Sequence, residues 1–203
     1  MTKPMEPSEE QAWLEAYRNG DVEALGKLVE HTRRPLYSFI LRMTTPQEAD
    51  EIFQEVWFRA VKNIMRYEDR NRNIMSWLFR IARNLVIDRA RKKKPDFNLE
   101  DSGRGPDADA STWYDRLAIG GLGPDTIVAG QDLGQRIAAA VATLPAEQRE
   151  VFLMRTEGAV PFKEIAQIQD ISINTALARM HYAIAKLRDK LVDDYQAFQQ
   201  TAS

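Results

Sequence analysis

Residues 162–191 read FKEIAQIQ (162–169), DIS (170–172) and INTALARMHYAIAKLRDKL (173–191), and they decide the fold of the second half of the chain. The first segment predicts a short helix with an apolar side made by Ile165, Ala166 and Ile168. The third segment repeats apolar residues with the period of a longer helix, and Ser172 is well placed to cap that helix. Two helices joined by about three residues are typical of a helix-turn-helix.

A helix-turn-helix binds duplex DNA because its second helix is narrow enough to enter the major groove while the first helix braces it. The exposed faces of the second helix offer side chains that contact phosphates or read base edges. These residues are Asn174, Thr175, Ala178, Arg179, His181, Tyr182 and Lys186. Taken alone, the motif leaves open a helical bundle that has two helices and a short turn but no DNA-binding function.

The first half of the chain also shows helical periodicity. Apolar residues on both sides of Asn19-Gly20-Asp21 predict two short helices, the second capped by Asp21. Pro35 predicts the start of a third helix over Leu36 to Met43. Two amphipathic helices follow. Their inward residues are Ile52, Phe53, Val56, Trp57, Ala60, Val61 and Ile64 in the first, and Trp77, Leu78, Ile81, Ala82, Leu85 and Val86 in the second.

A segment between these helical regions combines turn-forming and acidic residues, as in DSGRGPD (101–107) and GGLGP (120–124). After it, two helices joined at Leu144-Pro145 precede the helix-turn-helix, and neither helical region contains a strand pattern. We therefore predict an all-α protein with two small helical domains, residues 9–94 and 133–200, joined by a flexible acidic linker over residues 95–132. The C-terminal domain is the helix-turn-helix.

The charges of the chain are unevenly distributed although the formal net charge is only −2. Residues 61–94 hold eleven basic and three acidic side chains, or +8, whereas residues 95–135 hold eight acidic and two basic ones, or −6. Tyr67, Trp77 and Phe79 lie within the basic block. Single-stranded nucleic acid is held by charged grooves together with base stacking worth about 1–3 kcal/mol per base. A solvated charged face, and a core position for Trp77, are the alternative interpretations.

Composition argues against several other classes of protein. There are no cysteines, only His31 and His181 as histidines, and no P-loop, dinucleotide fingerprint or nucleophile motif. We therefore expect a protein that is not an enzyme and that uses no cofactor and no metal. No apolar run approaches the ~20 residues of a membrane span, and the N-terminus lacks the apolar region of a secretion signal. A cytoplasmic protein without membrane insertion is the expectation.

Four segments resemble one family. ADEIFQEVW (49–57) and MSWLFRIARNLVIDRAR (75–91) are similar to region two of the extracytoplasmic-function (ECF) sigma factors of the sigma-70 family, and LPAEQREVF (144–152) and FKEIA through NTALAR (162–179) are similar to region four. The resemblance implies an alternative sigma factor that binds core RNA polymerase, recognises promoter DNA and promotes strand opening. It also implies an anti-sigma factor as a regulatory partner.

The resemblance assigns a role to each candidate residue. It implies that Asp50, Gln54 and Glu55 bind the clamp coiled coil of the polymerase, and that Asn84 lies at the pocket for an extruded base. It implies that the minus-ten strand is bound by Tyr67, Trp77, Arg80, Arg83, Asn84, Asp88 and Arg91, and that the second helix of the helix-turn-helix reads the minus-thirty-five duplex. Many relatives have glycine at positions 170 and 174 and arginine at 177 and 182, so the base preference of those relatives does not transfer.

A free-standing helix-turn-helix regulator that binds duplex DNA without polymerase is the alternative function. It explains the C-terminal segment, but it leaves the acidic helix and the basic, aromatic block without a role.

Overall fold

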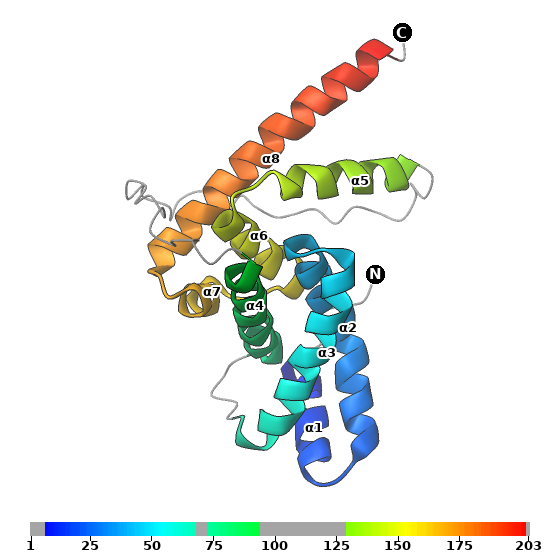
Figure 1. Cartoon of the computed structure of the whole chain (residues 1–203), viewed down its shortest axis with the longest axis vertical. Coiled ribbons are helices and arrows are strands. Elements are labelled where there is room, and N and C mark those ends of the chain that lie inside the picture. Colours follow the sequence, from blue (N-terminus) through cyan, green and yellow to red (C-terminus); the bar gives the residue numbers. More distant parts are fainter. Residues whose placement is uncertain (1–6, 68–72, 94–128, 202–203) are drawn as a thin grey trace.

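The computed structural model describes residues 7–67, 73–93 and 129–201, and these residues are helical apart from their connections, with no strand among them (Figure 1). The first two ranges, here called the N-terminal unit, form α1 (Pro7–Arg18), α2 (Val22–Met43), α3 (Pro46–Asn63), the 3₁₀ helix η1 (Ile64–Arg66) and α4 (Ile74–Lys93). The third range, the C-terminal unit, forms α5 (Ala129–Ala142), α6 (Ala146–Gly158), α7 (Phe162–Gln169) and α8 (Ile173–Thr201). The all-α prediction is confirmed.

The predicted linker lies mostly outside the described residues. Its last four positions, 129–132, form the first turn of α5 instead of linker. The described helices fit the predicted two-domain organisation, but the predicted domain boundaries themselves stay predictions.

Local signals set several helix ends where the sequence predicts them. Asp21 caps α2 by accepting a hydrogen bond from the Glu23 amide at 2.9 Å. Ser172 caps α8 by accepting one from the Thr175 amide at 3.0 Å. Between α7 and α8, Asp170 adopts a left-handed conformation with φ of 56°. An aspartate tolerates this conformation better than most residues, so the turn forms without glycine.

Pro35 does not begin a helix, and the prediction of a separate helix from Leu36 to Met43 is wrong. Pro35 lies inside α2, which runs without a break from Val22 to Met43. A proline inside a helix costs a backbone hydrogen bond. Here Leu28, Leu36, Phe39 and Ile40, on both sides of Pro35, are fully buried, so tertiary packing of the whole apolar face outweighs the local cost.

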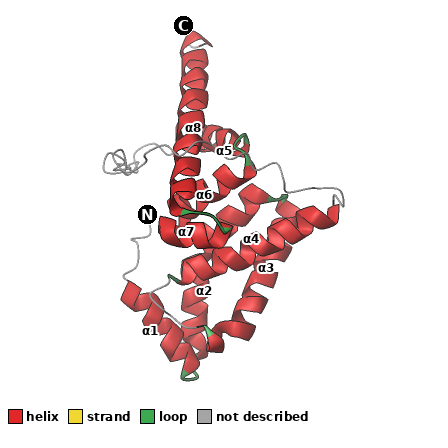
Figure 2. Ribbon diagram, turned by 90° about the vertical axis from the view of Figure 1, so that its left-hand side faces the viewer, coloured by secondary structure: helices red, strands yellow, loops and turns green. Residues whose placement is uncertain are grey.

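The two units pack against each other. Helix α6 contacts α2 and α4, and α7 contacts α4 (Figure 2). Buried apolar residues of both units belong to one continuous hydrophobic core. The Phe39 and Phe79 rings of the N-terminal unit meet edge-on at 5.0 Å, and Gly158 at the end of α6 lies directly against Phe79. The relative position of the units is therefore fixed by packing in this structure.

Helices α5 and α8 contact each other, and α8 extends away from the rest of the molecule (Figure 1). None of the helices in the described part of the chain combines the length and apolar character needed to cross a membrane.

Candidate functional site

One exposed face of α3 carries the three residues Asp50, Gln54 and Glu55, here called the acidic face. The Tyr37 hydroxyl donates a hydrogen bond to Asp50 Oδ1 at 2.8 Å, and this bond raises the pKa of Tyr37 above its ordinary value. Arg59 Nε donates to Glu55 Oε1 at 2.7 Å. Asp50 and Gln54 are exposed and Glu55 is partly exposed. The two carboxylates are thus oriented by neighbours but accessible to a partner.

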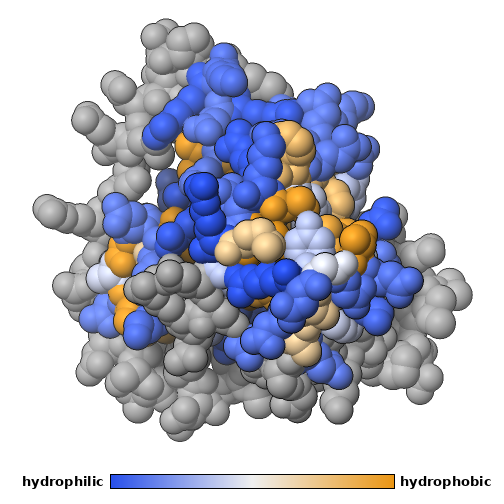
Figure 3. All heavy atoms as spheres, turned by 90° about the horizontal axis from the view of Figure 1, so that it is seen from below, coloured by the Kyte–Doolittle hydropathy of each residue, from blue (hydrophilic) through white to orange (hydrophobic). Residues whose placement is uncertain are grey.

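Apolar side chains continue this surface toward the end of α3. Phe58, Val61 and Met65 are exposed, with Lys62 Nζ 3.9 Å from the centre of the Phe58 ring. Viewed from the end of the molecule that holds the α1–α2 turn, apolar patches interrupt the mainly hydrophilic surface (Figure 3). The prediction that Val61 faces inward is wrong, because the buried side of α3 follows Ile52, Val56 and Ala60, and Val61 lies beside it.

Phe58 and Met65 are absent from the predicted site. The signal that points to Phe58 is an aromatic residue between Glu55 and Lys62 on the polar side of an amphipathic helix, where burial does not require it.

Helix α4 carries all the residues predicted to bind the minus-ten strand except Tyr67, and the charged and amide side chains among them fall into two groups. Asn84, Asp88 and Arg91 are exposed. Arg80 and Arg83 instead contact the C-terminal unit. Arg83 Nε donates to Glu150 Oε2 at 2.7 Å, and Arg80 Nη2 lies 3.4 Å from the carbonyl oxygen of Gln167. The sequence predicts these arginines as one DNA-binding set, but the structure leaves only part of the set open to solvent.

Tyr67 and Trp77 form a stacked aromatic pair beside these arginines. Their ring centres are 4.6 Å apart with an interplanar angle of 30°. Arg18 fixes the backbone beneath the pair by donating to the carbonyl oxygens of Ile64 and Tyr67. Tyr67 is buried and Trp77 is partly exposed. One part of the Trp77 side chain is therefore packed against the core, and the other part is open to solvent.

A cavity of about 290 Å³ lies next to this pair. The N-terminal unit contributes Arg66, Tyr67, Ser76, Trp77 and Arg80 to its wall, and the C-terminal unit contributes Glu164, Gln167 and Ile168. Stacked aromatics next to arginines make a surface suited to an unstacked base and its phosphate. Helix α7 lies over this surface in the structure.

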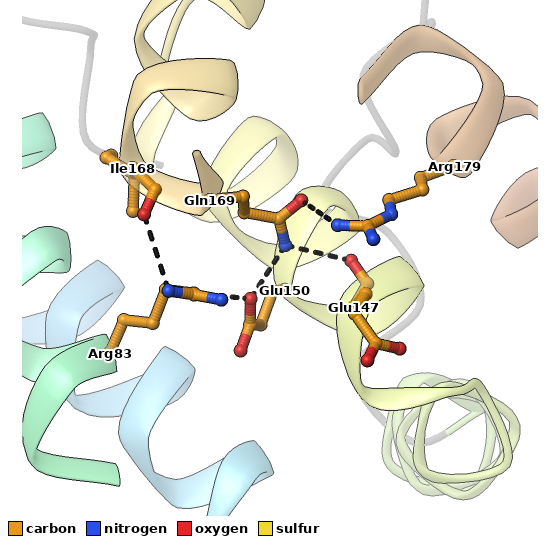
Figure 4. Close-up of polar contacts among 6 residues, drawn as sticks. All are labelled: Arg83, Glu147, Glu150, Ile168, Gln169 and Arg179. Atoms are coloured by element: carbon orange, nitrogen blue, oxygen red, sulfur yellow. Dashed lines mark hydrogen bonds and ion pairs between the residues drawn. The ribbon is translucent and has the colours of Figure 1, made fainter. Parts of the chain in front are cut away.

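The second helix of the helix-turn-helix is α8, and α7 braces its start. Asn174, His181, Tyr182 and Lys186 are exposed, whereas Thr175, Ala178 and Arg179 are partly buried. Arg179 Nη1 donates to Gln169 Oε1 at 2.8 Å, and the His181 and Tyr182 rings meet edge-on at 5.8 Å. Four of the seven predicted residues of α8 are therefore open to solvent, and Arg179 is held partly buried by its bond to Gln169 (Figure 4).

Metal-ligating side chains do not gather in the described part of the chain, where no group of three or more histidines and carboxylates is close enough to hold an ion.

Comparison with known proteins finds the same two regions. The model of Sigma-70 region 2 matches residues 28–95, from within α2 to just past α4, and the model of Sigma-70 region 4 matches residues 134–187, from α5 into α8. The ECF RNA polymerase sigma factor SigW of Bacillus subtilis is 33% identical over 181 residues, which are 89% of this chain and 95% of SigW. The chain belongs to the ECF family of RNA polymerase sigma factors.

This sigma factor is also similar to another relative and to two solved structures. The ECF RNA polymerase sigma factor SigE of Mycolicibacterium smegmatis is 25% identical over 203 residues, 98% of this chain and 75% of SigE. CnrH, solved in complex with the cytosolic domain of CnrY, has a TM-score of 0.62 at 19% identity and covers 92% of this chain and 99% of its own. The sigma factor RpoE of Bartonella quintana, solved with the anti-sigma factor NepR, has a TM-score of 0.59 at 20% identity. The match covers 84% of this chain and 98% of the RpoE chain. Both structures therefore share the fold of most of this chain.

Proposed function

We propose that this protein is an alternative sigma factor that binds core RNA polymerase, recognises promoter DNA and promotes strand opening. The observation that carries the proposal is the order of surfaces in one chain: an acidic face on α3, a basic and aromatic surface on α4, and a helix-turn-helix in α7 and α8. A free-standing duplex-binding regulator needs only the last of these.

The acidic face is the proposed polymerase-binding site. Asp50, Gln54 and Glu55 are accessible, and the adjoining Phe58 and Met65 supply apolar area. A partner surface that carries basic residues beside apolar ones would complement them, since charge guides association and buried apolar area supplies free energy.

The surface of α4 is the proposed site for the minus-ten strand. Tyr67 and Trp77 supply stacking, and Arg80, Arg83 and Arg91 supply charge for the phosphates, with Asn84 as the contact to an extruded base. Extruding a base costs a few kcal/mol, which stacking and pocket contacts must offset. Asp88 lies one helical turn beyond Asn84 and completes the set.

Helix α8 is the proposed reader of the minus-thirty-five duplex. Asn174, Thr175 and Ala178 lie near its start, where a recognition helix contacts base edges. Arg179 and Lys186 would contact phosphates, and His181 and Tyr182 extend the same side. The Ser172 cap fixes the start of the helix relative to α7.

A regulatory partner is part of the proposal. CnrH and RpoE were solved with the cytosolic domain of CnrY and with the anti-sigma factor NepR, respectively. By likeness to them, we propose that an anti-sigma factor binds this protein, that it acts in the cytoplasm, and that it catalyses no reaction itself.

Transcription with purified components tests the proposal. The protein and core RNA polymerase are mixed with a promoter library, and RNA start sites are sequenced. Discrete start sites that require both proteins are expected. In a parallel gel shift, the protein alone should bind promoter duplex weakly, and core polymerase should create specific binding. Specific, tight binding of duplex without polymerase, together with no transcription, would instead favour the free-standing regulator.

A further inference from the structure

Two carboxylates of α3 are already paired with arginines. Glu51 Oε2 accepts a hydrogen bond from Arg89 Nη1 of α4 at 2.8 Å. Glu55 Oε1 accepts one from Arg59 Nε of the next helical turn at 2.7 Å. A carboxylate that already holds one cation gains less from a second, because its charge is partly balanced. Glu51 and Glu55 are therefore the weaker anchors for a basic partner.

Asp50 of the same helix is held by a neutral group instead. Its Oδ1 atom accepts a hydrogen bond from the Tyr37 hydroxyl at 2.8 Å, and none of the described cationic groups pairs with it. This bond, together with the negative charge of Asp50, stabilises the protonated hydroxyl and so raises the pKa of Tyr37. Asp50 is exposed. It therefore presents an unbalanced negative charge that is fixed in position.

Tertiary packing places the Tyr37 hydroxyl. Tyr37 lies on α2, between Leu36 and Phe39 along the helix in positions next to the buried face. Its ring meets the Phe53 ring of α3 edge-on, with centres 5.7 Å apart and an interplanar angle of 76°. The donor and the acceptor thus belong to two helices that pack against each other. The hydroxyl is held in place by that packing.

A groove leaves the Tyr37–Asp50 pair open to a partner. It has a volume of about 1320 Å³, and both residues line it together with Leu41, which is 38% exposed. A basic side chain with an apolar stem could lie in such a groove, its stem along Leu41 and its charge at Asp50.

Fixing the carboxylate before binding favours association. An exposed aspartate samples several rotamers, and a partner that needs one of them must bear the entropy of selecting it. The Tyr37 hydroxyl selects an orientation in the free protein. Because tyrosine is neutral, it does so without balancing the charge, whereas an arginine in its place would do both.

We propose that Asp50 is the main charged anchor of the acidic face and that Tyr37 is the positioning residue that holds its carboxylate ready for the polymerase. This assignment rests on the proposed function, since core polymerase is the partner. Tyr37 is absent from the predicted site, because α2 and α3 meet only in the folded chain.

The dissociation constant for core polymerase, measured by competition against a fluorescent sigma factor, tests both roles. Asp50→Asn should raise it at least about tenfold, since an unbalanced charge is lost, and Glu55→Gln should raise it less than about threefold. Tyr37→Phe keeps the ring against Phe53 and removes only the hydroxyl, and it should raise the constant about threefold or more. Tyr17→Phe is the matched control and should leave the constant unchanged, because the Tyr17 hydroxyl has no hydrogen bond within the described residues.

Combined substitutions separate positioning from a merely structural role. Tyr37→Phe with Asp50→Asn should bind as weakly as Asp50→Asn alone, because no charge is left to position. Tyr37→Phe with Glu55→Gln should show the product of the two single effects. Thermal unfolding verifies that each variant is folded. Equal losses from Tyr37→Phe in both backgrounds, or no loss from Tyr37→Phe by itself, would overturn the positioning role.

Nuclear magnetic resonance of protein isotope-labelled at the tyrosine Cζ atom tests the bond without polymerase. The Tyr37 signal, identified by its absence from Tyr37→Phe, should titrate with a pKa above the ordinary value for tyrosine, and this pKa should fall in Asp50→Asn. The same pKa in both proteins would mean that the bond is absent, and the proposal would be wrong.

The outcomes distinguish this proposal from the proposed function. If the unaltered protein does not bind core polymerase at all, the proposed function fails, and the roles of Asp50 and Tyr37 fail with it. If the unaltered protein binds and Asp50→Asn binds equally well, the proposed function stands, and Asp50 is not the anchor.

Discussion

Charge reversal at Glu55 separates the proposed polymerase contact from a purely structural role. Glu55 pairs with Arg59 one turn later, and the two side chains are 38% and 46% exposed. Exposed pairs at this spacing stabilise a helix by about 0.3–0.5 kcal/mol, and a like-charge pair destabilises it by a similar amount. Glu55→Lys should therefore lower the free energy of unfolding by less than about 1 kcal/mol and leave the fold intact.

The expected loss of polymerase affinity is larger. If the partner surface is basic, a lysine at position 55 replaces an attraction with a repulsion at the interface, where juxtaposed like charges cost several kcal/mol. We expect at least a tenfold increase in the dissociation constant for core polymerase, equivalent to about 1.4 kcal/mol. Competition against a fluorescent sigma factor measures this constant, and thermal unfolding of each variant measures stability.

A charge swap is the matched control. Glu55→Lys combined with Arg59→Glu restores the pair within α3 but leaves position 55 with the wrong charge for the polymerase. The double variant should regain the thermal stability of the unaltered protein. Its affinity for core polymerase should stay reduced. If the swap restored full affinity, or if Glu55→Lys alone left affinity unchanged, the role of the acidic face in polymerase binding would be refuted.

Four further substitutions test other parts of the molecule. Asn84→Ala should reduce open-complex formation, followed by permanganate reactivity of promoter thymines, more than polymerase binding; equal losses of both would contradict its assignment to the melted strand. Arg179→Ala should weaken binding of the polymerase complex similarly across promoter sequences and reduce the salt dependence by about one phosphate contact, whereas a change in sequence preference would indicate base reading. Ser172→Ala should destabilise the protein by about 1 kcal/mol in denaturant unfolding, and no change would mean that the cap contributes nothing. Ala159→Gly should raise stability by up to about 1 kcal/mol, because Ala159 has a left-handed φ of 51°, and a lower melting temperature would contradict this.

Sequence reasoning succeeded where the determinants are local. The helix over 162–169, the turn at Asp170 to Ser172 and the start of α8 lie where periodicity and capping place them. The capping hydrogen bonds of Asp21 and Ser172 span two to three residues, so the information that sets them is contained in a short segment. The family assignment succeeded for a related reason, since it rests on residue patterns within such segments.

The same reasoning failed at Pro35. A proline at the first turn of a helix and a proline tolerated inside one leave the same local signal. What decides between them is the burial of Leu36, Phe39 and Ile40 against distant helices, which no short window contains.

The sequence by itself determined that the described residues are helical, where α2, α7 and α8 begin, and which segments carry acidic and basic side chains. Only the tertiary structure decided which of those side chains are free. Arg83 and Glu150 are 67 positions apart and Arg80 and Gln167 are 87 apart, so a basic residue that looks solvated in the sequence becomes part of an interface. Periodicity and capping act over a few residues, whereas exposure depends on every element that packs nearby, and this is the physical reason for the difference.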